Sequence, residues 1–279
     1  LLVALLGELG IEAQVALVRT QDEGRLHDGV ASLGVFNHAI AYVPSLGWWL
    51  DATAQRHSPL ELPAADAGGT ALRIALPGPE HVEVRLERLP ERESQAHARD
   101  EEIELTVFPD GKASVDLHIQ LRGLPAAQVR QRLDEASTRR ERLEQDLAAR
   151  FPGLRVTEVH VEGISPLADE VRVRIRGSMP RWAQVRAGGL TAMPLRPGGS
   201  LVQTLAALPT RRHEVVLDHP ILETSRLRIH LPPDLQAPPL PAALDRPGPA
   251  GARFGLSARQ DGAVVEWNQR LQLPSRRIP

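Results

Sequence analysis

Two residues in one short stretch of the chain have the types and the spacing for acid–base chemistry. His38 opens the run His38–Val43, and Asp51 lies in the run Trp48–Thr53 that follows. A carboxylate that accepts a hydrogen bond from an imidazole fixes its tautomer and stabilises its protonated form. Such a pair supplies the base and the orienting residue of a nucleophilic triad. The stretch therefore predicts part of a catalytic site, with His38 as the base and Asp51 as its partner.

The pair can meet only if the two runs form one hairpin in a defined register. Alternation of residue types predicts a strand for each run, and residues 44–47, which include Pro and Gly, predict a turn. A four-residue loop places Val43 opposite Trp48. His38 and Asp51 then share one face as diagonal neighbours, about 7–8 Å apart at the backbone. A loop of odd length would put them on opposite faces.

Two other interpretations of these residues stay open. His38 and Asp51 could be ordinary strand residues that meet solvent or a loop, because any His and Asp in a hairpin have an even chance of sharing a face. A metal site is the third interpretation, and it would add His57 or Asp66. No metal-ligand spacing in the sequence supports that site.

Composition narrows the class of protein. The 279 residues carry 33 basic and 35 acidic side chains, a net charge of −2, without the basic excess of a nucleic-acid binder. Hydrophobic residues make up 42% of the chain, as in ordinary globular proteins. The sequence has no Cys, so it holds no disulfide and no cysteine nucleophile of its own. It also lacks the run of about 20 apolar residues that a membrane span needs.

The elements before the hairpin are predicted from short patterns. Leu1–Leu9 is apolar nearly all round, as in a buried helix, and Gly10 suits the end of that helix. Residues 13–20 alternate as in a strand. Because no capping residue precedes the apolar run at Leu1, we expect the sequence to enter this helix partway along.

The rest of the chain is predicted to be mostly strand. Short alternating runs predict strands over 71–76, 82–89, 101–108, 113–121, 154–161, 170–176, 213–217, 225–231, 252–258 and 263–273. Short strands at such regular spacing are typical of a β-sandwich. One long amphipathic helix is predicted over 125–150, with an apolar stripe that covers one sandwich face or, alternatively, binds a partner. Three histidines in the strand-like runs are expected to be surface or core residues: His118, His160 and His230.

The stretch Gly34–Thr53, with the helix and strand before it, resembles the transglutaminase-like superfamily of papain-type folds. The resemblance covers about residues 1–55. In that superfamily the triad runs Cys, His, Asp along the chain, and His38 and Asp51 match the last two members in order and spacing. The resemblance implies an α+β fold and thiol-dependent acyl transfer or amide or peptide hydrolysis. It also implies a protein or peptide amide as substrate, with no cofactor and no metal.

The resemblance further implies a cysteine that this chain lacks. In the superfamily the cysteine opens the helix, where the helix dipole lowers the pKa of the thiol. We therefore expect it upstream of Leu1, and we expect these 279 residues alone to be inactive. Asn37, Tyr42 and Trp49 are expected to line the substrate cleft. Of Trp48 and Trp49, one should pack in the core and the other should wall the cleft beside His38.

The predicted organisation has three parts. Residues 1–56 would be the C-terminal part of a transglutaminase-like domain, 57–70 a linker rich in Pro and Gly, and 71–279 a β-sandwich region, divided near 200–212 if it holds two sub-domains. Bacterial proteins of the superfamily often carry such flanking β-sandwiches, which favours the cell envelope or periplasm. The alternative function is a non-catalytic interaction or scaffold protein with a degenerate transglutaminase-like part.

Overall fold

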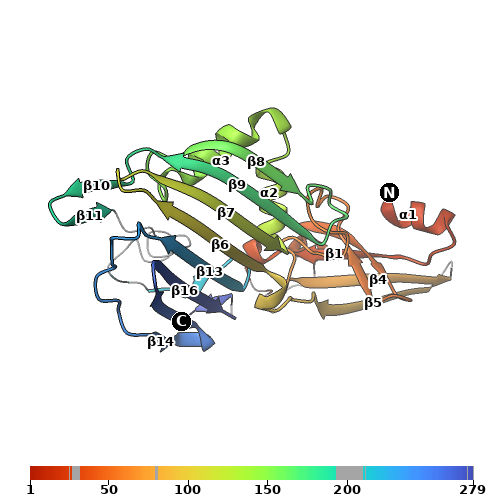
Figure 1. Cartoon of the computed structure of the whole chain (residues 1–279). Helices are drawn as coiled ribbons and strands as arrows, with labels where there is room; N and C mark the ends of the chain where they lie inside the picture. The colour runs from red at the N-terminus through yellow and green to blue at the C-terminus, as the bar shows by residue number, and fades with distance from the viewer. Residues whose placement is uncertain are drawn as a thin grey trace. The chain divides into compact units, whose positions relative to one another are not determined.

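The protein is mostly β. The computed structural model describes residues 1–24, 26, 32–78, 81–192, 210, 212–274 and 276–278. It divides into two compact units, Leu1–Arg92 and Glu93–Pro279, which we call unit 1 and unit 2 (Figure 1). Among the described residues, strand makes up 46% and helix 16%, with three short α-helices. The predicted α+β papain-type fold with one long amphipathic helix is therefore wrong.

Unit 1 is built on one sheet of five strands. Its elements are α1 (Leu2–Glu8), β1 (Gln14–Arg19), β2 (His38–Val43), β3 (Trp48–Leu50), β4 (Thr70–Gly78) and β5 (His81–Arg88). The order across the sheet is β3-β2-β1-β4-β5, and every neighbouring pair is antiparallel. Since β4 pairs with β1, residues 57–70 connect strands of the same sheet.

The β2–β3 hairpin has the register that the sequence predicts. Val43 pairs with Trp48, Tyr42 with Trp49, and Ala41 with Leu50. The four residues between the strands form the turn, as expected. Residues of even number on β2 and of odd number on β3 consequently point to the same face of the sheet.

One face of this sheet is covered by the segment between β3 and β4, residues 51–69, which we call the covering segment. Strand residues Ala16, Val18, Ile40 and Ala71 pack with Leu62 of the covering segment and with Leu89 in a buried cluster. Two backbone hydrogen bonds tie the segment down. Gln21 N–H donates to the carbonyl of Ala65 at 2.7 Å, and Leu89 N–H donates to that of Gly69 at 2.9 Å.

The helix α1 is not the buried helix that its apolar sequence predicts. None of its residues is buried, and Leu5 and the flanking Leu9 are 53% and 75% exposed. The cluster of unit 1 is filled instead by the strands and the covering segment. The prediction was wrong because apolar character shows that a helix can be buried, without showing what would bury it.

Among its described residues, unit 2 contains one large sheet of eight strands, two small sheets of two strands each and two α-helices. Its elements are β6 (Ala98–Val107), β7 (Ala113–Arg122), α2 (Leu124–Arg132), α3 (Arg139–Ala148), β8 (Arg155–Glu162), β9 (Glu170–Met179), β10 (Ala183–Arg186), β11 (Gly189–Ala192), β12 (Val215–Val216), β13 (Ile221–His230), β14 (Leu244–Pro247), β15 (Arg253–Asp261), β16 (Val264–Leu273) and β17 (Arg277–Ile278). The sheet order is β14-β15-β16-β13-β6-β7-β9-β8, and β13 runs parallel to β6. Each predicted strand run overlaps one of the observed strands of the two units.

The predicted long helix over 125–150 is broken between α2 and α3. Glu135 is extended, and its side chain accepts the backbone N–H of Ser137. Such local side-chain bonds compete with helical ones. The guanidinium of Arg139 donates to the carbonyl of Leu133 at 2.6 Å and so satisfies a group that the broken helix leaves free.

The two faces of the large sheet differ in character. Leu133, Leu143 and Leu147 of the helical region pack with strand residues such as Leu117 and Ile175 in the main hydrophobic cluster. The opposite face carries the alternate residues of the same strands, which are largely charged. Helices therefore form the second layer on one face only of the sheet among the described residues.

The hairpin of β6 and β7 ends in a turn over residues 108–111. Gly111 has a φ of +81°, and a Cβ there would lie 2.3 Å from the carbonyl oxygen of Ala183. Asp110 accepts the backbone N–H of Lys112 at 3.1 Å, and its other oxygen lies 2.7 Å from Nζ of the same lysine. Lys112 is the one lysine of the chain.

The predicted division near 200–212 falls, apart from residues 210 and 212, outside the described residues. In the part of the chain that the structure describes, no helix has both the length and the apolar character to cross a bilayer.

Gly69 gives a test of how tightly the covering segment is packed. A Cβ at Gly69 would lie 2.8 Å from the carbonyl oxygens of both Arg19 and Asp66. Gly69→Ala should therefore lower the free energy of unfolding by about 1–3 kcal/mol, the usual cost of forcing atoms into a packed site. Urea unfolding measures the change. Gly78→Ala, at the far end of β4 with no atom within 4 Å, is the control, and an equal effect of both variants would contradict the packing.

Candidate functional site

His38 and Asp51 meet, as the hairpin register requires. Nε2 of His38 lies 3.3 Å from Oδ2 of Asp51. The side chain of His38 is 24% exposed, whereas that of Asp51 is 2% exposed. The imidazole thus remains accessible while its carboxylate partner is closed off from water. The predicted contact is confirmed, and the catalytic role of the two residues stays a prediction.

Asn37 fixes the backbone just before His38. Its Nδ2 donates to Oγ1 of Thr20 at 2.9 Å, and its Oδ1 accepts the backbone N–H of Thr20 at 3.0 Å. These two bonds join the residue after β1 to the residue before β2. Both ends of the Asn37 amide are therefore used to position His38, and a role of Asn37 in a substrate cleft stays a prediction.

Thr53 holds the carboxylate of Asp51 in place. Its backbone N–H and its hydroxyl each donate to Oδ1 of Asp51 at 2.8 Å. Burial by itself would raise the pKa of Asp51, but the hydrogen bonds from Thr53 and the nearby His38 lower it below its ordinary value. Asp51 is consequently ionised at neutral pH and can accept a hydrogen bond from His38.

Asp66 brings a second carboxylate to the same imidazole nitrogen. Its Oδ2 lies 3.8 Å from Nε2 of His38, its side chain is 3% exposed, and this oxygen has no hydrogen-bond partner among the described residues. The backbone turns sharply there, because Gly69 N–H donates to the carbonyl of Asp66 at 2.7 Å. Burial, and then the charge of Asp51, raise the pKa of Asp66 to about 6 against the opposing effect of His38.

The sequence suggests Asp66 only as one of two additions to a metal site. The structure brings His38, Asp51 and Asp66 together, with one ligand atom of each within 4.8 Å of the others. His57, the other suggested addition, is not in this group. The signal for Asp66 was its setting: a lone charged residue among Ala64, Ala65, Ala67 and two glycines, in a segment predicted as a linker.

The aromatic residues near the pair lie on both faces of the sheet. The rings of Tyr42 and Trp49 are 4.5 Å apart between centroids, and the guanidinium of Arg73 lies 4.4 Å from the Tyr42 centroid. Both rings are on the face of His38, and Trp49 packs against the buried cluster. Trp48 points to the opposite face and is 42% exposed, so it does not wall the site. Tyr42 and Trp49 stay predicted cleft residues.

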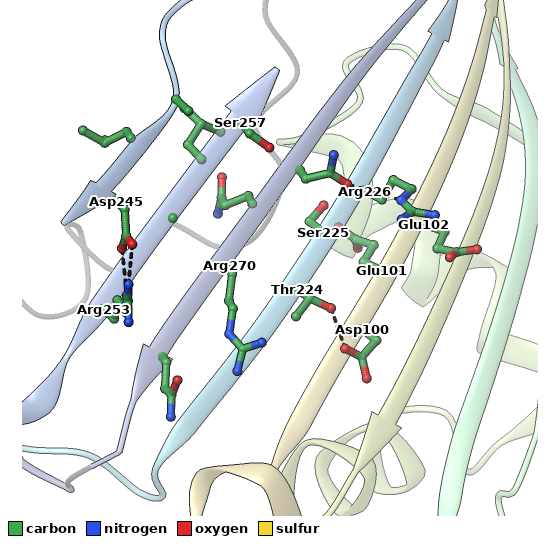
Figure 2. A pocket seen from close by; sticks show the side chains of 17 residues that line it. Asp100, Glu101, Glu102, Thr224, Ser225, Arg226, Asp245, Arg253, Ser257 and Arg270 are labelled. Carbon is green, nitrogen blue, oxygen red and sulfur yellow. Dashed lines mark hydrogen bonds and ion pairs between the residues drawn. The ribbon is translucent and has the colours of Figure 1, made fainter. Parts of the chain in front are cut away.

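Unit 2 offers a hollow of about 960 Å³ on its polar face (Figure 2). Arg253 forms an ion pair with Asp245 across it, and Arg226 donates to Asn268 at 3.2 Å. The described residues that line it include no histidine. In unit 1, by contrast, an imidazole lies against two carboxylates.

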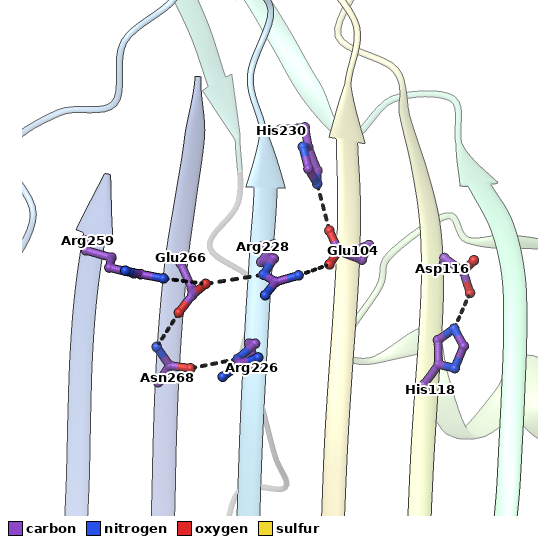
Figure 3. Close-up of polar contacts among 9 residues, drawn as sticks. All are labelled: Glu104, Asp116, His118, Arg226, Arg228, His230, Arg259, Glu266 and Asn268. Carbon is purple, nitrogen blue, oxygen red and sulfur yellow. Dashed lines mark hydrogen bonds and ion pairs between the residues drawn. The ribbon is translucent and has the colours of Figure 1, made fainter. Parts of the chain in front are cut away.

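Three histidines of unit 2, His118, His160 and His230, lie on strands of the large sheet. His230 is 2.7 Å from Glu104, which also accepts from Arg228 at 2.9 Å, and His118 is 3.0 Å from Asp116 (Figure 3). His160 lies 3.0 Å from Glu162. The three imidazoles are 43–66% exposed, so they are surface residues, which is one of the two states expected of them.

The geometry predicts which nitrogen of His38 carries the proton. Ionised carboxylates only accept hydrogen bonds, so neutral His38 should be protonated on Nε2, which leaves Nδ1 as the basic nitrogen. In NMR spectra the Hε2 proton of His38 should be protected from exchange, and Asp51→Asn should remove this protection. His160 is the internal control, because its Nε2 also lies near a carboxylate, that of Glu162, but its side chain is 66% exposed. Its ring proton should exchange rapidly. A proton found on Nδ1 of His38 in the unaltered protein would contradict the arrangement.

The raised pKa of Asp66 gives a pH dependence of defined sign. Its pKa of about 6 in the folded protein exceeds the ordinary value of 3.8, so the folded state binds more protons between these pH values. The free energy of unfolding should then fall, through this group, as pH rises from about 4 to about 6. Asp66→Asn removes the titration. The variant should therefore gain stability relative to the unaltered protein over that interval, as measured by urea unfolding.

Asp116 provides the control for this measurement. A hydrogen bond from Arg174, helped by a weaker one from Arg176, holds its pKa at about 2 against the opposing effect of burial. Its contribution is present above about pH 4 and is lost as pH falls toward 2. The difference between Asp116→Asn and the unaltered protein should thus stay constant where that of Asp66→Asn changes. A flat Asp66→Asn difference would show that the Asp66 pKa is not raised.

Comparison with known proteins leaves the site to be interpreted from its own geometry. No family model, no curated protein and no solved structure matches the chain. The chemistry of the site is therefore inferred from His38, Asp51 and Asp66 and from the elements that position them.

Proposed function

We propose that unit 1 carries the His–Asp part of a site for thiol-dependent acyl transfer or amide hydrolysis. The observation that supports this is the contact of His38 Nε2 with the buried Asp51 carboxylate at 3.3 Å. Because this contact occupies Nε2, the Nδ1 atom of the partly exposed His38 ring remains available to take a proton from a nucleophile. The order of the two residues along the chain, which resembles that of the transglutaminase-like superfamily, adds to the argument.

The roles of the residues follow from proton transfer. His38 would take the proton of a thiol as the sulfur attacks an amide carbonyl, and would then give that proton to the leaving amine. Asp51 would stabilise the imidazolium in between. The resulting thioester would pass its acyl group to an amine or to water. No cofactor is needed for either step.

The proposal requires a thiol that the 279 residues do not contain. It therefore places the nucleophile outside them, beside Nδ1 of His38. The substrate would be a protein or peptide amide, with Tyr42 and Trp49 as candidate residues of the cleft. The proposal concerns this chemistry and does not depend on a papain-type fold.

The proposal is tested by activity measurements on the natural protein that contains these residues together with a cysteine. His38→Ala should lower the rate of amide hydrolysis or amine incorporation by about 10²–10⁴-fold, the usual contribution of a general base. Asp51→Asn should also lower it, because the ring loses its orienting carboxylate. His160→Ala, at an exposed imidazole of unit 2, is the matched control and should leave the rate unchanged.

Two outcomes would contradict the proposal. One is unchanged activity in His38→Ala. The other is a parent sequence without a cysteine, in which case unit 1 would be a scaffold and the protein a non-catalytic interaction protein with a β-rich unit 2. Alkylation of the parent's cysteine by iodoacetamide, with loss of activity, would agree with the proposed role of the thiol.

A further inference from the structure

The three side chains at His38 have the spacing of metal ligands. Zinc holds imidazole nitrogen and carboxylate oxygen at about 2.0–2.2 Å in a tetrahedron, so two ligand atoms of one ion lie about 3.4 Å apart. Nε2 of His38 lies 3.3 Å from Oδ2 of Asp51 and 3.8 Å from Oδ2 of Asp66. The second distance is too long for a hydrogen bond. Both distances are close to the edge length of such a tetrahedron.

Charge and burial favour a cation at this point. The side chains of Asp51 and Asp66 are 2% and 3% exposed, and ionised carboxylates without a positive partner are costly to bury. Thr53 satisfies Oδ1 of Asp51, but Oδ2 of Asp66 is buried and has no hydrogen bond among the described residues. This oxygen lies 3.8 Å from Nε2 of His38, and one ligand atom of each of the three residues lies within 4.8 Å of the others.

We infer that His38, Asp51 and Asp66 bind one divalent transition-metal ion, for which zinc is the best match in ligand type and distance. Each residue would supply one atom, Nε2 from the imidazole and one oxygen from each carboxylate. Because His38 is the most exposed of the three, water would take the remaining position on that side.

This inference goes beyond the proposed acyl transfer and does not rest on it. A metal on Nε2 replaces the proton that His38 donates to Asp51, so the ion would compete with the orientation that acyl transfer needs. Metal binding can be measured on the 279-residue chain, which has no thiol, whereas acyl transfer requires one. Failure of one proposal is thereby distinguished from failure of the other.

The experiment is a calorimetric titration of the folded chain with Zn²⁺, repeated with Co²⁺ to follow coordination by visible absorption. One equivalent of Zn²⁺ per chain should bind more tightly than any further equivalent. Asp66→Asn should weaken this equivalent at least about tenfold, since even the partners of metal ligands contribute 10–100-fold to affinity, and His38→Ala should weaken it as well. His160→Ala removes an imidazole that faces a carboxylate at 3.0 Å without a second buried one, and it should bind like the unaltered protein.

Thermal unfolding is the second measurement, in case a variant folds poorly. Zn²⁺ should raise the unfolding temperature of the unaltered protein and of His160→Ala, because a ligand stabilises the state that binds it. It should raise that of Asp66→Asn less. The inference is overturned if Asp66→Asn binds Zn²⁺ as tightly as the unaltered protein does, or if no equivalent binds more tightly to the unaltered protein than to folded His38→Ala.

Discussion

Two buried carboxylates that face one imidazole nitrogen set the main physical constraint on unit 1. Asp51 and Asp66 repel each other, and their burial reduces the screening that water would provide. The arrangement is stable only while a proton or another positive charge lies between them. The turn that carries Asp66 must be held against this repulsion, and the hydrogen bonds of Gln21 and Leu89 to the covering segment do so.

The contact of His38 with Asp51 was predictable from the sequence because it is local. A four-residue turn fixes the hairpin register, and alternation along each strand then decides the face of every residue. Asp66 could not be placed in the same way. It reaches His38 only because β4 pairs with β1 and the covering segment folds back between them, and no short-range pattern encodes that pairing.

The strands were predicted well and the helices poorly. Strand alternation follows from a sheet with one apolar and one polar face, and unit 2 has such a sheet. The helical spacing of apolar residues continues from Leu133 to Leu143, so it cannot reveal the break that Glu135 and Arg139 make between them. The papain-type expectation came from the hairpin stretch, and a hairpin is too small a unit to specify the sheet that contains it.

The turn between β6 and β7 has a practical consequence. It holds Lys112, whose side chain is 61% exposed beside Asp110, and the sequence offers no other lysine. An amine-reactive fluorophore or crosslinker will therefore attach to unit 2 through a side chain at one known point. Such a label would report on the surroundings of this turn in solution, without an engineered attachment site.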